Sequence, residues 1–218
     1  HQLIFELTKR EMFERYAGQV LGPLWVIGHP LLLMGLYVFI FAVVFPTRFP
    51  IDAEMPRTYV VYILAGLVPW LAFADAMNRT CMAVVANTSL VKQVAFPVEV
   101  LPIKGALAAF ATQLVATAVL ILYVAAVDPG GFSLMLLLLP LLFALQVTAM
   151  IGVAYLLAAV AVFFRDLREL VQLFTTAGLF LAPILYLPQW VEQAWSPLVW
   201  VLWLNPFSHL VCCYQDAI

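Results

Sequence analysis

Charged side chains are scarce in this sequence, and their positions limit the chemistry that the chain can perform. Asp75 and Arg79 are four residues apart, so on a helix they lie on one face and can neutralise each other. We interpret them as a structural ion pair. The densest group of charges runs from Arg165 to Glu169, between two long apolar stretches. This stretch is predicted to be a loop whose charges are candidates for contact with a partner.

The sequence contains no pattern that is typical of an enzyme active site or a metal site. There is no G-x-x-x-x-G-K-[ST] stretch to bind nucleotide phosphates, no His/Glu zinc pattern, and no Ser or Cys nucleophile with an evident histidine and acid. Cys81, Cys212 and Cys213 lack metal-ligand spacing and are expected to be buried thiols. His29 is expected to be a structural residue. We therefore expect no catalytic residue, no metal, and no cofactor bound by this chain.

Composition indicates a membrane protein. Hydrophobic residues make up 66% of the 218 residues and charged residues 10%, whereas about a quarter of the residues in a soluble domain are charged. Spans need about 20 apolar residues each, so the chain has room for five or six helices. The predicted fold is an all-α, polytopic membrane protein with a single transmembrane domain over 1–218. The net charge of -2 and the lack of a basic run give no indication of a nucleic-acid partner.

The order of apolar and polar stretches predicts the elements of this domain. Residues 1–22 combine charges with apolar residues and are predicted to form an amphipathic helix in the membrane interface, with an ordinary solvated helix as the alternative. Complete spans are predicted at residues 24–45, 59–77, 105–127, 132–164 and 170–187. Residues 188–207 contain four tryptophans and are predicted to form short re-entrant helices in the outer leaflet. Residues 210–218 are predicted to begin a truncated sixth span, so the natural chain is expected to be longer.

Two features near the third span are also informative. The polar stretch before it is a candidate docking element, in which Ser89 can cap a short helix that begins at Leu90 and that Pro97 would end. The span itself is predicted to carry a small-residue face suited to close helix packing, formed by Ala106, Ala108, Ala109, Ala111 and Ala116.

The distribution of lysine and arginine predicts the orientation of the chain. Eight of the 10 basic residues precede the first span or follow the second and fourth spans, and only Arg48 and Arg57 lie in a loop on the other side. Since basic residues favour cytoplasmic loops, the N-terminus is expected in the cytoplasm. We also expect the energy for any transport to come from another subunit, because the apolar stretches lack the carboxylates that ion-coupled carriers use.

Seven local motifs occur along nearly the whole chain. They are Arg15-Tyr16 with 21–25 (LGPLW), 29–32 (HPLL), 64–70 (LAGLVPW), 90–102 (LVKQVAFPVEVLP), 163–168 (FFRDLR), 182–186 (APILY) and 204–207 (LNPF). In this order they resemble the permease subunits of ABC-2 type transporters that export polysaccharides such as O-antigen, capsule and teichoic acid. The sequence departs from that family at His29, where relatives more often carry glutamine, and in the absence of a complete sixth helix.

The resemblance implies a permease that moves a lipid-linked polysaccharide across the inner (plasma) membrane. It implies a homodimer of permeases with two separate ATP-binding subunits, which would hold ATP and Mg, and contact with membrane lipid. The residues implied in coupling to the ATP-binding subunit are Ser89, Lys92, Glu99, Arg165, Asp166 and Arg168. A possible glycan path is lined by Tyr37, Phe41, Trp70 and Phe73, unless these rings face lipid or neighbouring helices.

Three alternatives stay open at this point. An ABC-2 exporter of a drug or a lipid would share the fold, and only the ordered motifs count against it. A polytopic membrane enzyme acting on lipid-linked sugars would need converging acidic or histidine side chains, whereas Asp128 and Glu192 stand alone on the outer side. A secondary carrier would need its own coupling carboxylates.

Overall fold

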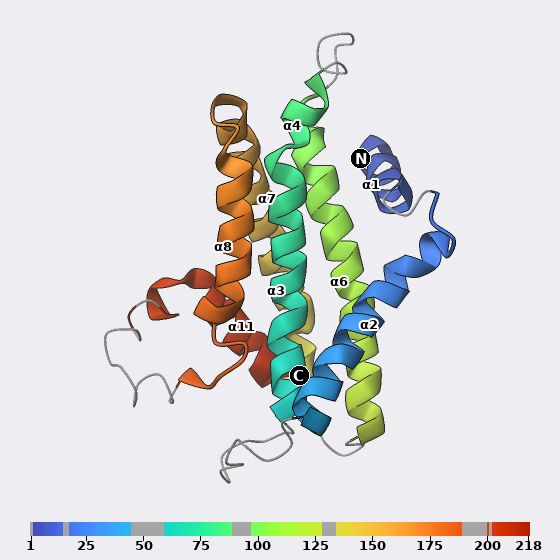
Figure 1. The fold of residues 1–218 in the computed structure, drawn as a ribbon, viewed down its shortest axis with the longest axis vertical. Coiled ribbons are helices and arrows are strands. Elements are labelled where there is room, and N and C mark those ends of the chain that lie inside the picture. Colours follow the sequence, from blue (N-terminus) through green and yellow to red (C-terminus); the bar gives the residue numbers. More distant parts are fainter. Residues whose placement is uncertain are drawn as a thin grey trace. The chain divides into compact units, whose positions relative to one another are not determined.

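The computed structural model describes residues 2–14, 18–44, 59–88, 97–127, 134–188, 200 and 202–218. In these ranges every regular element is a helix (Figure 1). Helical stretches that are long and apolar enough to cross a membrane are Tyr59–Cys81, Val100–Val127 and Leu134–Phe163. The prediction of an all-α, polytopic membrane protein is confirmed.

The N-terminal helix α1 (Gln2–Glu14) is shorter than the helix predicted over residues 1–22. Its described apolar side chains Leu3, Phe5 and Phe13 are exposed within the chain. The chain turns at Gly18 and Gly22, whose φ angles of 81° and 46° lie in the left-handed region that glycine adopts most easily. These glycines explain why a helix cannot continue through this part of the predicted range.

The first predicted span corresponds to α2 (Trp25–Val38), which continues as a π-helical segment over Phe39–Val44. A 3-10 turn over Gly22–Leu24 leads into α2. Pro30 lies inside this helix and is buried. Helix therefore occupies nearly all of the predicted range 24–45.

The next helices extend beyond the spans predicted at 59–77 and 105–127. Helix α3 covers Tyr59–Cys81 and is followed by the single turn of α4 (Ala83–Ala86). Helix α6 covers Val100–Val127, so it includes Pro102 and Lys104. A proline is tolerated in the first turn, where its missing amide hydrogen has no helical partner. Lys104 is compatible with this helix because lysine has a high helix propensity, and its ammonium group forms an ion pair with Glu11.

The fourth and fifth predicted spans differ in how well they match the structure. A 3-10 helix over Leu134–Leu138 leads into α7 (Leu139–Phe163), within the predicted range 132–164. Helix α8 covers Leu167–Leu181, whereas the span was predicted over 170–187. Pro183 explains the early end, because proline disfavours the helical conformation of the residue before it and lacks an amide hydrogen. The last helix is α11 (Pro206–Ala217).

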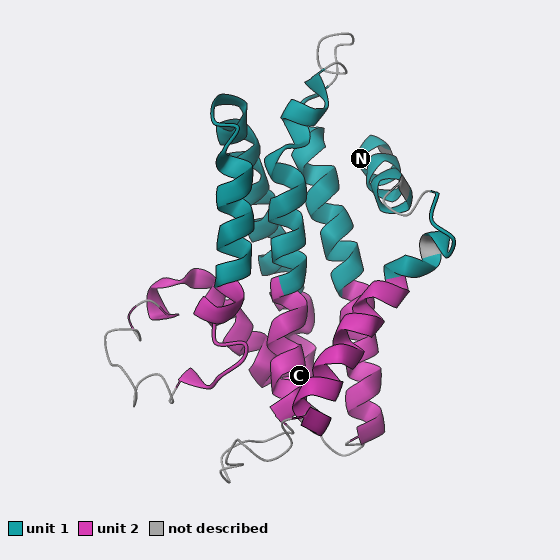
Figure 2. Ribbon diagram, viewed as in Figure 1, with its two compact units in different colours: residues 1–26, 71–113, 143–177 teal, residues 27–70, 114–142, 178–218 magenta. Residues whose placement is uncertain are grey.

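The chain divides into two compact units (Figure 2). Unit 1 consists of residues 1–26, 71–113 and 143–177, and unit 2 of residues 27–70, 114–142 and 178–218. Helices α3, α6, α7 and α8 each contribute residues to both units. Each unit is therefore assembled from segments that are far apart in the sequence.

Helix α6 packs closely against its neighbours in unit 1. A Cβ atom at Gly105 would lie 3.1 Å from Cγ2 of Thr80 on α3. The amide nitrogen of Gln113 on α6 donates to Oε1 of Gln146 on α7 at 2.7 Å, and both side chains are buried. Of the alanines in the predicted small-residue face, Ala111 is half-buried and the buried ones are Ala106, Ala108, Ala109 and Ala116.

Unit 2 is built around Trp70 of α3. This side chain is only 2% exposed and meets the ring of Phe207 on α11 edge to face, with centroids 5.0 Å apart. Its ring also lies against the backbone of Gly178 on α8, where any Cβ atom would overlap it. Trp70 therefore joins three helices of this unit.

Candidate functional site

The first predicted coupling loop is the stretch before α6 that contains Ser89, Lys92 and Glu99, of which Glu99 is described. Ser89 and Lys92 lie outside the described residues. Glu99 is exposed and immediately precedes α6. The amide of Val100 donates to the carbonyl of Pro97 at 3.1 Å, which ties this turn to the start of the helix. A carboxylate at this position is favoured by the positive end of the helix dipole.

The second predicted coupling loop is the tight turn between α7 and α8. The amide of Leu167 donates to the carbonyl of Phe164 at 3.2 Å, which closes the turn. Arg165, Asp166 and Arg168 are all exposed, and none of them forms an ion pair within the described ranges. Their charged groups therefore lie on the surface of this turn.

The two loops belong to the same unit. Glu99, Arg165, Asp166 and Arg168 all lie in unit 1, and the start of α6 and the α7–α8 turn lie at one end of that unit (Figure 2). Within the unit, α3 is linked to α8 by a hydrogen bond from Nδ2 of Asn78 to Oγ1 of Thr175, 3.2 Å long. Exposed charges of both signs are thus gathered at one end of a packed helix bundle.

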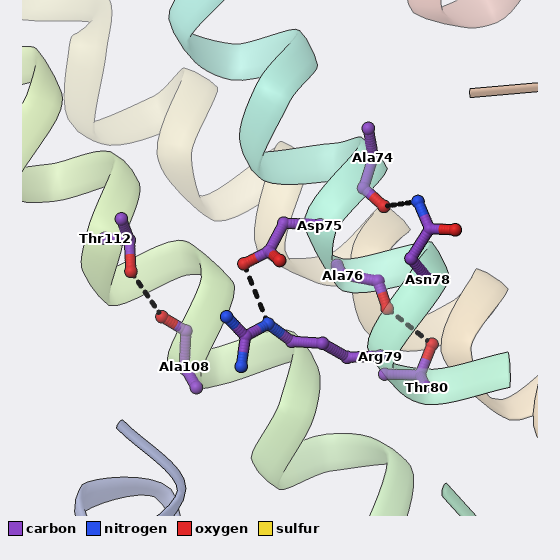
Figure 3. Close-up of polar contacts among 8 residues, drawn as sticks. All are labelled: Ala74, Asp75, Ala76, Asn78, Arg79, Thr80, Ala108 and Thr112. Carbon is purple, nitrogen blue, oxygen red and sulfur yellow. Dashed lines mark hydrogen bonds and ion pairs between the residues drawn. The ribbon is translucent and has the colours of Figure 1, made fainter. Parts of the chain in front are cut away.

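Asp75 and Arg79 form the ion pair that their spacing predicts. Nε of Arg79 lies 2.8 Å from Oδ2 of Asp75, and the two side chains are 16% and 27% exposed (Figure 3). Nearby polar side chains on α3 bond to their own helix, as Thr80 does to the carbonyl of Ala76 at 2.8 Å. Figure 3 shows Arg79 reaching from α3 towards α6. The pair neutralises two charges between helices, which suits a structural role.

One ion pair was missed by the sequence analysis. Nζ of Lys104 on α6 lies 2.8 Å from Oε2 of Glu11 on α1, and the two side chains are 17% and 26% exposed. No local pattern relates these two residues, because they are far apart in the sequence. The pair fixes the N-terminal helix to the helix that directly follows the first coupling loop.

The four aromatic residues of the predicted glycan path are not in one kind of environment. Tyr37 and Phe41 stack with ring centroids 6.2 Å apart and are half-buried. Tyr59, which the sequence analysis did not select, packs edge-on against Phe41 at 5.8 Å. Trp70 is buried in unit 2, and Phe73 is 8% exposed in unit 1. Burial within the chain favours the alternative for Trp70 and Phe73, namely packing against neighbouring helices.

Comparison with known proteins gives a match along the whole chain. The family described as ABC-2 type transporter matches residues 2–218. An O-antigen export system permease protein of Myxococcus xanthus is 30% identical over 213 residues, which cover 98% of this chain and 78% of that protein. Another, from Klebsiella pneumoniae, is 26% identical over 214 residues, covering 98% of this chain and 79% of that protein.

A third relative is named for a different cargo. The polysialic acid transport protein of Escherichia coli is 28% identical over 221 residues, covering 97% of this chain and 79% of that protein. The chain has the apolar helices of a multi-pass membrane protein, and its relatives are transporter components. From the match over residues 2–218 and the 30% identity to one permease, the chain belongs to the ABC-2 type transporter family.

Proposed function

We propose that the chain is the permease subunit of an ATP-driven exporter that moves a lipid-linked polysaccharide, such as O-antigen, from the cytoplasm across the inner membrane. The observation that carries this proposal is the similarity to O-antigen export permeases over 98% of the chain. The ordered motifs from 21–25 to 204–207 support it as well. The polysialic acid transport relative also handles a polysaccharide by its name, which favours a glycan over a drug or a lipid.

The permease works with a separate ATP-binding subunit, in an assembly of two permeases and two ATP-binding subunits. ATP and Mg bind to that partner. Exposed charges at one end of unit 1, which form no ion pair with another described residue, support a docking surface that includes Glu99, Arg165, Asp166 and Arg168. Ser89 and Lys92 belong to the same proposed surface by sequence. The basic residues of these loops favour the cytoplasmic side, which is where an ATP-binding subunit is found.

The path of the glycan includes Tyr37 and Phe41. Flat apolar ring faces suit the faces of sugars while letting a polymer slide. The stacked, half-buried arrangement of these two rings, extended by Tyr59, supports this role. Trp70 is buried in unit 2, which favours packing against neighbouring helices over a place on the path. Phe73 is buried in unit 1, which likewise favours packing against neighbouring helices.

Co-purification with the ATP-binding subunit tests the proposal. The full-length permease and a candidate ATP-binding subunit from the same organism are expressed together in cells that lack their own O-antigen permease. We expect a detergent-stable complex with ATPase activity and polysaccharide at the cell surface. An inactive ATP-binding subunit provides the control. Absence of any ATP-binding partner would refute the exporter assignment, and a complex that exports only a drug or a lipid would refute the cargo.

A further inference from the structure

The chain leaves α8 through a buried corner, residues 182–185. Ala182, Pro183 and Ile184 are buried in unit 2 although they are not helical. The amide of Ile184 donates to the carbonyl of Ala182 at 2.7 Å, so the corner is tightly turned. Buried carbonyl groups need a donor, because an unpaired polar group away from water costs free energy. The carbonyl of Ala182 has its donor within the corner, whereas the carbonyls of Pro183 and Leu185 accept from other segments of the chain.

Two side chains supply these donors. The hydroxyl of Tyr59 on α3 donates to the carbonyl of Leu185 at 2.7 Å. Nε2 of Gln215 on α11 donates to the carbonyl of Pro183 at 2.9 Å and lies 3.4 Å from the carbonyl of Tyr62 on α3. Both neighbours of this amide nitrogen are carbonyl oxygens, which only accept, so the amino group of Gln215 must face them.

Gly66 leaves the space that Gln215 needs. A Cβ atom at this position would lie 2.7 Å from Nε2 of Gln215 and 3.0 Å from Cγ1 of Val211. Helices α3 and α11 therefore approach closely at the level where Gln215 reaches the corner. Gln215 is 9% exposed, so its hydrogen bonds are sheltered from water.

The other end of the α8–α11 connection is fixed to the same helix. Helix α11 begins at Pro206, and the ring of Phe207 packs on Trp70 of α3 with centroids 5.0 Å apart. Oδ1 of Asn205 accepts from the amide of Phe207 at 3.0 Å, which defines the start of α11. Both ends of the connection are thus held by α3.

We propose that Tyr59 and Gln215 form a polar clasp that holds the corner at residues 182–185 on α3, and that both are positioning residues for export. The role in export rests on the proposed function, whereas the clasp itself does not. The clasp determines where the chain leaves α8. A displacement of α3 consequently carries both ends of the α8–α11 connection with it.

Hydrogen exchange measured by mass spectrometry on the full-length permease in lipid nanodiscs tests the clasp. Tyr59→Phe removes one donor, and Gln215→Met removes the other while keeping a similar volume. Tyr155→Phe and Gln172→Met are matched controls, because both side chains are exposed. Loss of one hydrogen bond is expected to speed exchange in peptides covering 182–187 about fivefold. Exchange in α6 and in both control variants is expected to stay unchanged.

Three outcomes would overturn the clasp or its role. Unchanged exchange at 182–187 in both variants refutes the clasp, and faster exchange that extends equally to α6 refutes a local role.

Gly66→Ala displaces Gln215 without altering it, and it is expected to reproduce the Gln215→Met result. With the ATP-binding subunit present, both clasp variants are expected to export severalfold less glycan per ATP hydrolysed. Normal export despite faster exchange refutes the positioning role and leaves the proposed function intact.

Discussion

Lys104 on α6 and Glu11 on α1 form an ion pair, with Nζ and Oε2 2.8 Å apart. The next residue, Gly105, lies against Thr80 on α3. The first turns of α6 are therefore held from two sides, by a charge pair with α1 and by close backbone packing with α3. Because α6 starts directly after Glu99, this exposed carboxylate lies close in sequence to both contacts.

Reversing either charge of this pair should loosen α1. We expect Lys104→Glu or Glu11→Lys to lower stability by about 1 kcal/mol, since a partly exposed pair contributes little more than that. The double reversal should recover most of the loss. Thermal unfolding in detergent gives the double-mutant cycle. Strictly additive effects of the two changes would show that the pair contributes no coupling energy.

The hydrogen bond between Gln113 and Gln146 joins α6 to α7 inside unit 1. Changing Gln113 to Leu leaves the buried amide of Gln146 without this partner, at an expected cost of about 1–2 kcal/mol. Gln113→Leu combined with Gln146→Leu should be closer to the parent, because neither partner is then left over. The midpoint of thermal unfolding measures the difference. A double variant that is less stable than both single variants would contradict this account.

The contact between Gly178 and Trp70 predicts that the stability cost of replacing a helical glycine by alanine depends strongly on which glycine is replaced. Gly178→Ala should destabilise the protein by about 1–3 kcal/mol, because the new methyl group overlaps the indole ring. Gly152→Ala is the matched control, since nothing lies within 4 Å of a Cβ atom there. Adding Trp70→Phe to Gly178→Ala should recover part of the loss. Equal unfolding temperatures for the two single glycine variants would contradict the packing described for Trp70.

Charge reversal in the two coupling loops should separate ATP hydrolysis from export. Arg168 is exposed and unpaired within the described ranges, so Arg168→Glu should leave the protein folded. We expect export to fall at least tenfold while the assembled ATP-binding subunit still hydrolyses ATP. Lys92→Glu should behave alike, and Arg168→Lys, which keeps the charge, should retain coupling. If both charge-reversed variants export at the parent rate, these loops do not couple ATP hydrolysis to export.

The aromatic residues should divide into two classes by their burial. Tyr37→Leu and Phe41→Leu are expected to reduce export with little change in stability, because both rings are only half-buried. Trp70→Leu should instead lower stability by about 3 kcal/mol, because replacing a large side chain by a smaller one leaves a cavity in the packed core. Surface polysaccharide and unfolding temperature, measured on the same variants, separate the classes. Parent-level export by both Tyr37→Leu and Phe41→Leu would exclude them from the glycan path.

Local spacing was sufficient for some of these features. The ion pair of Asp75 and Arg79 follows from their separation of four residues, which places both side chains on one face of a helix. The long apolar stretches likewise predict the helices, although hydropathy placed the end of α8 at 187 and Pro183 ends it at Leu181. A window average gives little weight to a single proline, whereas backbone geometry depends on it.

Contacts between segments that are far apart in the sequence could not be predicted from local spacing. The partner of Glu11 and the donors to the corner at 182–185 depend on which helices become neighbours. A single sequence carries no signal for that choice. The burial of Trp70 could not be predicted either. The residues around a tryptophan in an apolar span do not tell whether its ring faces lipid, a channel or another helix.

The amide groups at the start of α11 find their hydrogen-bond partners within the chain. Pro206 has no amide hydrogen, the amide of Phe207 bonds to the Asn205 side chain, and the amide of Ser208 bonds to the Asn205 carbonyl at 3.0 Å. The first backbone groups of the helix therefore require no solvent. A chain with this sequence is able to begin this helix in dry, apolar surroundings, where no water would satisfy open amide groups.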